Sequence, residues 1–138
     1  MVVLLQVAVT RRTKKQQPLI MMSLGALLYA SGVTSVALGT SFWGFWLSMV
    51  IITLGELILV PTATTFVANL APEDKRGRYM SIFSLTWGVA AGIGPVVGGF
   101  LNDYINPQAI WYGGGLIGAM GAVWFLWQGK RKREDFGN

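Results

Sequence analysis

Long apolar blocks separated by short polar segments make up most of the chain. Runs with at most one charged side chain extend over residues 18–43, 42–70, 79–101 and 109–128. A helix needs about 20 apolar residues to cross the hydrocarbon core of a bilayer, so each run predicts a transmembrane helix. We therefore expect an all-α, polytopic transmembrane helical bundle, with full helices at approximately 18–40, 42–70, 78–101 and 109–129 and a tail at 130–138.

The first apolar stretch, residues 1–9, is too short to be a span. Nine helical residues at about 1.5 Å each do not reach across a bilayer, so we expect a helix stub at about residues 1–10. A secretory signal peptide carries its positive charges before the apolar stretch and a small-residue cleavage site after it. Here Arg11 and Arg12 follow the stretch and no such site is evident, so we reject that alternative.

Composition agrees with lipid as the solvent of these helices. Only 12% of the 138 residues are charged, against about 25% in a typical soluble domain. The chain contains no cysteine and no histidine, which excludes disulfides, zinc sites built from those ligands and histidine-dependent triads. The few serines lack a partner base, so we expect no enzyme, no cofactor and no metal site.

The lysines and arginines gather in three short segments. The connections at residues 38–44 and 102–108 carry a single charge, Asp103, so basic and non-basic connections alternate. This positive-inside pattern predicts a multi-pass protein of the cell inner membrane with its basic loops and C-terminus in the cytoplasm. A net charge of +5 would suit nucleic-acid binding in a soluble protein, but topology accounts for every basic residue, so we expect no nucleic-acid partner. The three segments are Arg11, Arg12, Lys14 and Lys15; Lys75, Arg76 and Arg78; and Lys130, Arg131, Lys132 and Arg133.

Aromatic residues mark the predicted membrane boundaries. Phe42 and Trp43 fall at one outer boundary and Tyr112 falls at the other, while Trp124 and Trp127 lie near the inner end of the last helix. Tryptophan and tyrosine favour the interface between hydrocarbon and headgroups. Their positions therefore agree with the orientation that the basic residues predict.

Glycines recur at helical spacing in the predicted spans. Lipid gives helices no hydrophobic reason to associate, so close approach through small residues supplies much of their packing. We expect packing seams at Gly25, Gly32 and Gly39 in the first full span and at Gly114, Gly118 and Gly121 in the last.

The third full span is the richest in small residues, with the stretch GVAAGIGPVVGG at residues 88–99. Small residues cover two faces of this helix, and its proline removes one intrahelical hydrogen bond and predicts a kink. We expect the helix to lie tightly between two neighbours and to bend or slide there, as packing or gating requires. The residues concerned are Gly88, Gly92, Gly94, Pro95, Gly98 and Gly99.

Two linked motifs in this region resemble the major facilitator superfamily. The order small-x-x-x-Gly-Pro-x-x-Gly-Gly, from Ala90 to Gly99, is similar to the family's antiporter motif, whose counterpart by internal repeat is the eleventh helix. The loop APEDKRGRYMS before it, residues 71–81, resembles the family's Pro-x-x-x-Arg-Gly connection at Pro72, Arg76 and Gly77. The opening LLQVAVTRRTKKQQPL resembles the end of the eighth helix and its cytoplasmic loop in drug efflux members.

On this resemblance the chain is the C-terminal part of a drug:proton antiporter-like transporter, from the end of helix eight through helix twelve. The family's two six-helix halves enclose a central cavity and rock to open it on alternate sides. The implied partners are a small-molecule substrate, protons, the lipid bilayer and the missing N-terminal helices of the same transporter. The implied function is proton-coupled efflux of lipophilic or drug-like molecules, which the isolated 138-residue chain is not expected to perform alone.

Glu56 is the ionisable residue that the second full span carries near its middle. A carboxylate at the bilayer centre costs at least about 2.5 kcal/mol on insertion scales, so it should face a partner or water. Burial without a counter-ion favours the neutral carboxyl, which could then carry a proton. The expected neighbours on its face are mostly apolar and suit a lipophilic ligand: Met49, Ile52, Thr53, Val60 and Ala63.

Within this face we select Glu56, Thr53 and Met49 as the substrate or proton site. Pro61, one turn further on, removes the donor for the carbonyl of Leu57 and predicts a hinge or a polar backbone acceptor beside the site. The alternative is that Glu56 hydrogen-bonds a neighbouring helix and serves packing.

Two other functions stay open at this level. A complete four-helix small multidrug exporter acting as a dimer would also use a membrane glutamate, although such proteins usually carry it in the first helix and show weak charge bias. A non-transporting membrane adaptor would use the small-residue faces to bind other helices.

Overall fold

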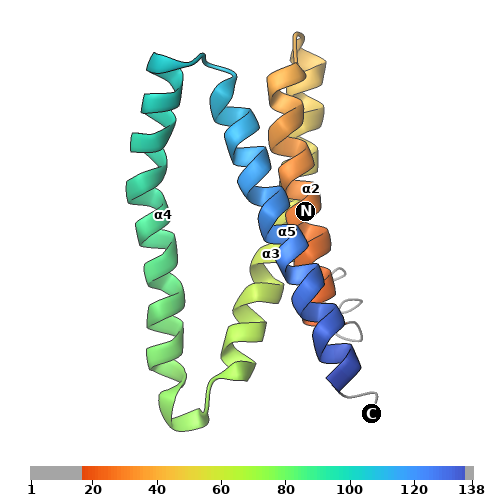
Figure 1. Cartoon of the computed structure of the whole chain (residues 1–138), viewed down its shortest axis with the longest axis vertical. Helices are drawn as coiled ribbons and strands as arrows, with labels where there is room; N and C mark the ends of the chain where they lie inside the picture. Colours follow the sequence, from red (N-terminus) through yellow and green to blue (C-terminus); the bar gives the residue numbers. More distant parts are fainter. Residues whose placement is uncertain (1–16, 136–138) are drawn as a thin grey trace. The chain divides into compact units, whose positions relative to one another are not determined.

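The structure is a computed structural model that describes residues 17–135. Its long helices are α2 (Pro18–Leu38), α3 (Phe42–Leu70), α4 (Arg76–Tyr104) and α5 (Ala109–Asp135), and the short 3-10 helix η1 (Glu73–Lys75) precedes α4 (Figure 1). Four helices in this part of the chain are long and apolar enough to cross a membrane, and residues 17–135 contain no strand. The predicted all-α transmembrane class is therefore confirmed. The stub expected at residues 1–10 lies outside the described residues.

Breaker residues set the helix ends. Pro18 is the first residue of α2, where its missing N–H removes no helical hydrogen bond. Gly39 is extended and stops α2 at Leu38. The Ser41 hydroxyl oxygen accepts a hydrogen bond from the Gly44 N–H at 3.3 Å, which caps the start of α3.

Two prolines lie inside helices. Pro61 falls within α3 and Pro95 within α4, and both helices continue beyond them. Each proline lacks the N–H that would bond the carbonyl four residues earlier. The carbonyls of Leu57 and Ala91 therefore lose their usual intrahelical donor.

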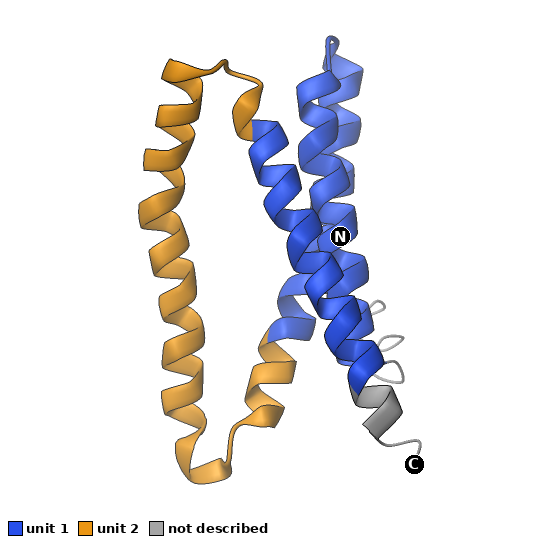
Figure 2. Ribbon diagram, viewed as in Figure 1, with its two compact units in different colours: residues 1–63, 111–138 blue, residues 64–110 orange. Residues whose placement is uncertain are grey.

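The chain forms two compact units, which Figure 2 shows in blue and orange. Unit 1 comprises residues 1–63 and 111–138, and unit 2 comprises residues 64–110. Unit 1 thus holds α2, the larger part of α3 and nearly all of α5. Unit 2 holds the end of α3, η1 and α4.

In unit 1, α2 and α3 lie antiparallel with their backbones in direct contact. A Cβ atom built on Gly25 would lie 2.9 Å from the Leu59 nitrogen, and one on Gly32 would lie 2.8 Å from the Ile52 nitrogen. Only glycine allows such an approach, as in other membrane helix pairs. The predicted seam is confirmed at these two glycines, whereas Gly39 lies in the turn after α2.

The opposite side of α2 packs against α5, again antiparallel. A Cβ on Gly118 would lie 3.0 Å from the Ala30 Cβ, and one on Gly114 would lie 3.2 Å from Val33 Cγ1. The Thr34 hydroxyl occupies the place that a side chain on Gly115 would need. The predicted seam holds at Gly114 and Gly118 but is wrong at Gly121, where no described atom lies within 4 Å of a built Cβ.

Serine hydroxyls join the three helices of unit 1. The Ser23 hydroxyl, which is 0% exposed, donates to the Ala122 carbonyl at 2.9 Å and links α2 to α5. The Ser35 hydroxyl lies 2.8 Å from the Ser48 hydroxyl oxygen on α3, and Ser48 donates onward to the Gly44 carbonyl at 2.9 Å. Helix α2 is therefore tied to a neighbour on each side.

In unit 2, the small-residue faces of α4 are open. No atom of this unit lies within 4 Å of a Cβ built on any of the glycines that the sequence selects for packing: Gly88, Gly92, Gly94, Gly98 and Gly99. Their role in packing or gating stays a prediction.

Candidate functional site

Glu56 lies on an exposed stripe of α3. Met49, Thr53, Glu56 and Val60 follow one another at intervals of four, three and four residues, which places them on one helix face. All four are exposed, and Met49 is exposed by 52%. The stripe combines one carboxylate, one hydroxyl and two apolar side chains.

Fewer residues share the exposed face of Glu56 than helical spacing in the sequence predicts. Ile52 turns toward α2, where its Cγ1 would lie 2.7 Å from a Cβ on Gly32. Ala63 is buried. Both residues therefore contribute to packing, while Met49, Thr53 and Val60 stay beside Glu56 on the exposed face.

The Thr53 hydroxyl is partly committed to its own helix. It donates to the Met49 carbonyl at 2.8 Å, as threonines in membrane helices commonly do. Its oxygen keeps lone pairs that can accept a hydrogen bond from a ligand. Thr53 can therefore serve this site as an acceptor but has no free proton to donate in this arrangement.

Tyr29 on α2 is the neighbour of Glu56 that the sequence analysis missed. The two residues come together because a Cβ on Gly55 would lie 2.6 Å from the Tyr29 nitrogen and 2.9 Å from the Gly25 carbonyl oxygen. Tyr29 therefore lies against the residue that directly precedes Glu56 on α3. The sequence did contain an indication of this proximity. Gly55 directly precedes Glu56, and Gly25 belongs to the predicted packing seam of α2, so a close contact between these two glycines could have been expected.

The other selected residues lie on separate elements. Pro61 is half-buried on α3, five residues after Glu56. Pro95 and the α4 glycines belong to unit 2, as do Arg76 and Gly77 in the first turn of α4. Both Arg76 and Gly77 are exposed, and the Gly77 carbonyl accepts a hydrogen bond from the Ser81 hydroxyl at 2.9 Å.

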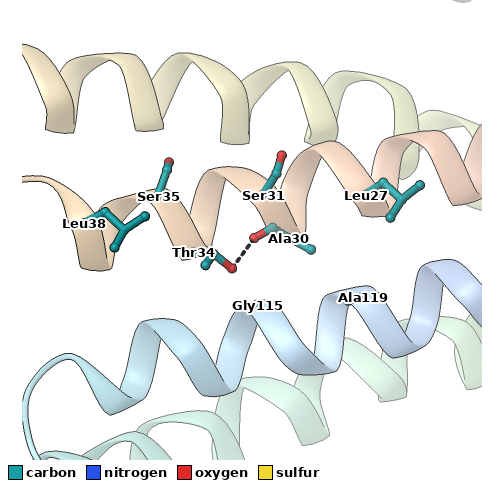
Figure 3. A pocket seen from close by; sticks show the side chains of 8 residues that line it. All are labelled: Leu27, Ala30, Ser31, Thr34, Ser35, Leu38, Gly115 and Ala119. Carbon is teal, nitrogen blue, oxygen red and sulfur yellow. Dashed lines mark hydrogen bonds between the residues drawn. The ribbon is translucent and has the colours of Figure 1, made fainter.

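Unit 1 also carries an open groove of about 400 Å³ between α2 and α5 (Figure 3). Each of its hydroxyl groups already has a protein acceptor: Ser31 donates to Leu28 at 2.8 Å and Thr34 to Ala30 at 2.8 Å, and Ser35 bonds as described above. The groove therefore presents a mainly apolar surface. Its lining residues are Leu27, Ala30, Ser31, Thr34, Ser35, Leu38, Gly115 and Ala119.

The part of the chain that the structure describes contains no cluster of metal-ligating side chains. Within those residues, no group of three or more acidic side chains is placed to hold a metal ion. Glu56 is therefore not part of such a group within residues 17–135.

Comparison with known proteins gives a consistent set of relatives. The sequence profile described as Major Facilitator Superfamily matches residues 2–138. The chain is 32% identical over 100 residues to the multidrug resistance protein MdtH of Photorhabdus laumondii, covering 72% of this chain and 25% of that protein. It is 30% identical over 114 residues to the Na(+), Li(+), K(+)/H(+) antiporter of Planococcus maritimus, covering 83% and 25% of the two chains.

A third relative is the uncharacterized MFS-type transporter YhjO of Bacillus subtilis. It is 27% identical over 108 residues, which cover 78% of this chain and 27% of the relative. The chain thus spans about a quarter of the length of the curated relatives it matches. No solved structure matches it.

Proposed function

This chain belongs to the major facilitator superfamily, and from that premise we propose that it forms part of a secondary active transporter that exports lipophilic or drug-like molecules in exchange for protons. The observation that carries the proposal is the position of Glu56. Its carboxylate lies on an exposed, mostly apolar stripe in the middle of a helix able to span the membrane.

The charge of Glu56 is costly in the middle of a membrane span. An ionised carboxylate near the bilayer centre costs at least about 2.5 kcal/mol on insertion scales, and the Glu56 side chain is exposed on its helix. A proton or a cationic ligand removes this cost. Intramembrane acids of this kind mark substrate or ion pathways by default.

A single carboxylate couples two ligands by competition. Protonated Glu56 is neutral and has no charge with which to hold a cation, whereas ionised Glu56 attracts one. Binding of a lipophilic cation on one side of the membrane would then displace a proton, and proton binding on the other side would release the cation. We assign Tyr29 to the same site, because its backbone lies against Gly55 beside Glu56.

The apolar neighbours of Glu56 suit a lipophilic ligand of variable shape. Met49 is unbranched and polarizable, and methionine adapts to irregular surfaces. The Thr53 oxygen supplies an acceptor for a polar group on the ligand. This combination favours broad recognition through apolar contact with one charge as the selecting feature.

We propose the remaining roles with family membership as their support. We assign packing and gating to Pro61, to Pro95 and to the glycines of α4, and a cytoplasmic loop to Arg76 and Gly77. The partners are the small-molecule substrate, protons, the bilayer and further helices of the same transporter. Membership in this family favours this function over a dimeric four-helix exporter.

One relative gives reason for a second candidate, the exchange of monovalent metal ions for protons. The relative that covers 83% of this chain carries the name of a Na(+), Li(+), K(+)/H(+) antiporter, and a single carboxylate serves metal ions as well as organic cations. Hard cations take several oxygen ligands, so this candidate requires further oxygen donors beside Glu56.

The test is substrate-induced proton movement in vesicles that contain the full-length protein. Wild type and Glu56→Gln are compared with lipophilic cations, neutral lipophilic compounds and monovalent metal ions, because glutamine keeps the shape of the side chain and removes its charge. Loss of cation export with retention of neutral export identifies charge recognition. Loss of all coupled transport with retention of counterflow exchange identifies a proton carrier.

Asp103→Asn is the matched control, because it removes an acidic charge at the exposed end of α4. It is expected to transport as wild type does. Unchanged transport by Glu56→Gln would overturn the proposed role of Glu56, and coupling to sodium, lithium or potassium alone would favour the second candidate.

A further inference from the structure

The exposed side of α5 combines an apolar stripe with a cationic end. Ile117, Met120, Trp124 and Trp127 follow at alternating intervals of three and four residues, so they share one helix face. Arg131 continues the same face one turn later. All are exposed, Trp124 by 57% and Trp127 by 52%.

This face points away from the seam with α2. The residues that contact α2, such as Gly118, Ala122 and Gly129, lie on the other side of α5 at 100° per residue. Within unit 1, the stripe is therefore free to meet lipid. Its length from Ile117 to Trp127 is about 15 Å, half of a hydrocarbon core of about 30 Å.

The end of the stripe lies at the boundary between apolar and polar surroundings. A Cβ on Gly129 would lie 3.4 Å from Leu19 Cβ and 3.5 Å from Ile20 Cγ1, so the end of α5 lies beside the first turn of α2. Polar Gln17 precedes that turn, and charged Lys130 follows Gly129. Two segments thus change from polar to apolar at one level, the level at which tryptophan prefers to lie.

Arg131 is held in a defined position at this level. Its guanidinium carbon lies 5.5 Å from the centre of the Trp127 ring, and the Trp127 and Trp124 rings are 5.4 Å apart. A cation over a tryptophan face is attracted by the ring. The planar guanidinium then keeps N–H groups available to bind a phosphate in bidentate fashion.

From these observations we propose that the α5 face from Ile117 to Arg131 binds one anionic phospholipid, with its phosphate on Arg131 and Lys130 and an acyl chain along the tryptophans and Met120. Charge complementarity selects the occupant. Lys130 and Arg131 are exposed, Lys132 and Arg133 follow in the sequence, and the acidic residues after them are Glu134 and Asp135. Basic residues next to a span attract anionic headgroups.

The test uses quenching of tryptophan fluorescence by brominated lipids, which requires contact. Full-length protein in phosphatidylcholine vesicles receives brominated phosphatidylglycerol or brominated phosphatidylcholine at equal mole fraction. The contribution of the two α5 tryptophans is taken as the difference from W124F/W127F. Phosphatidylglycerol is expected to quench this contribution more strongly, and K130Q/R131Q is expected to reduce its relative affinity on the order of tenfold.

The matched control is K75Q/R78Q, which removes two exposed charges from the other described basic segment. It is expected to keep the preference for phosphatidylglycerol. The proposal is overturned if the two lipids quench equally in wild type, if K130Q/R131Q behaves as wild type, or if K75Q/R78Q loses the preference to the same extent. If the double variant does not reach the membrane, the single variant R131Q is measured in its place and is expected to weaken the preference for phosphatidylglycerol. None of these measurements depends on transport.

Discussion

Gly55 lies so close to α2 that any side chain larger than a hydrogen atom would collide with that helix. The nearest atoms to a built Cβ are the Tyr29 nitrogen and the Gly25 carbonyl oxygen, both in the α2 backbone. Backbone atoms cannot relieve a clash by changing rotamer, as a flexible side chain can. The distance between Glu56 and Tyr29 therefore depends on the absence of one methyl group in the adjacent residue.

We predict that Gly55→Ala destabilises the protein by about 1–3 kcal/mol, because α2 and α3 must separate to admit the methyl group. Thermal unfolding of the purified full-length protein in detergent measures this loss. Coupled transport should fall with it, since Glu56 moves relative to Tyr29.

Gly121→Ala is the control within the same unit. No described atom lies within 4 Å of a Cβ at that position, and alanine favours helix over glycine, so no loss of stability is expected. Equal destabilisation by the two variants would contradict the close packing of α2 against α3 at Gly55.

At the scale of the elements, two serines of α2 differ in what their hydroxyls join. Ser23 reaches the Ala122 carbonyl of α5, whereas Ser31 returns to the Leu28 carbonyl of its own helix. We predict that Ser23→Ala lowers the free energy of unfolding by about 0.6 kcal/mol, the average for hydrogen bonds between membrane helices, and by no more than the maximum of about 1.7 kcal/mol. Ser31→Ala should leave it unchanged, and a comparable loss in both variants would show that the hydrogen bond between the helices is not the cause.

The sequence predicted where the helices lie along the chain far better than which side of each helix faces its neighbour. Apolar length alone identifies four spans, because a bilayer admits few alternatives to a helix. The seam on α5 was placed on Gly114, Gly118 and Gly121, but the contacts with α2 extend to Gly115 and Gly129 instead of Gly121. Glycines occupy two neighbouring stripes of α5, and only the position of α2 decides between them.

The candidate site was predicted in part for the same reason. Glu56 stands out because a charged residue in an apolar run is costly, and its neighbours on α3 follow from helical spacing. Tyr29 lies on another helix and could be paired with Glu56 only by knowing which turns of α2 and α3 meet. The division of the face between the exposed Met49 and the buried Ala63 likewise depends on that packing.

At the scale of the whole molecule, the charge pattern gives a testable orientation. The 138 residues contain no cysteine, so no cysteine of this segment competes with an introduced one for labelling. We predict that Ser41→Cys reacts with a membrane-impermeant maleimide in intact cells and that Lys132→Cys reacts only after permeabilisation, because basic segments remain in the cytoplasm. Gln108→Cys should label as Ser41→Cys does, and the reverse pattern would reject the orientation.

The Ser35 hydroxyl has two acceptors within reach, the Ser48 oxygen on α3 at 2.8 Å and the Gly32 carbonyl of its own helix at 2.7 Å. It carries a single proton and can donate to only one of them at a time. When α2 and α3 separate slightly, the hydroxyl can rotate to the carbonyl and remain satisfied, so this interaction adds little resistance to relative motion of the two helices. The Ser35 donor would therefore stay satisfied through a small change in the separation of the two helices.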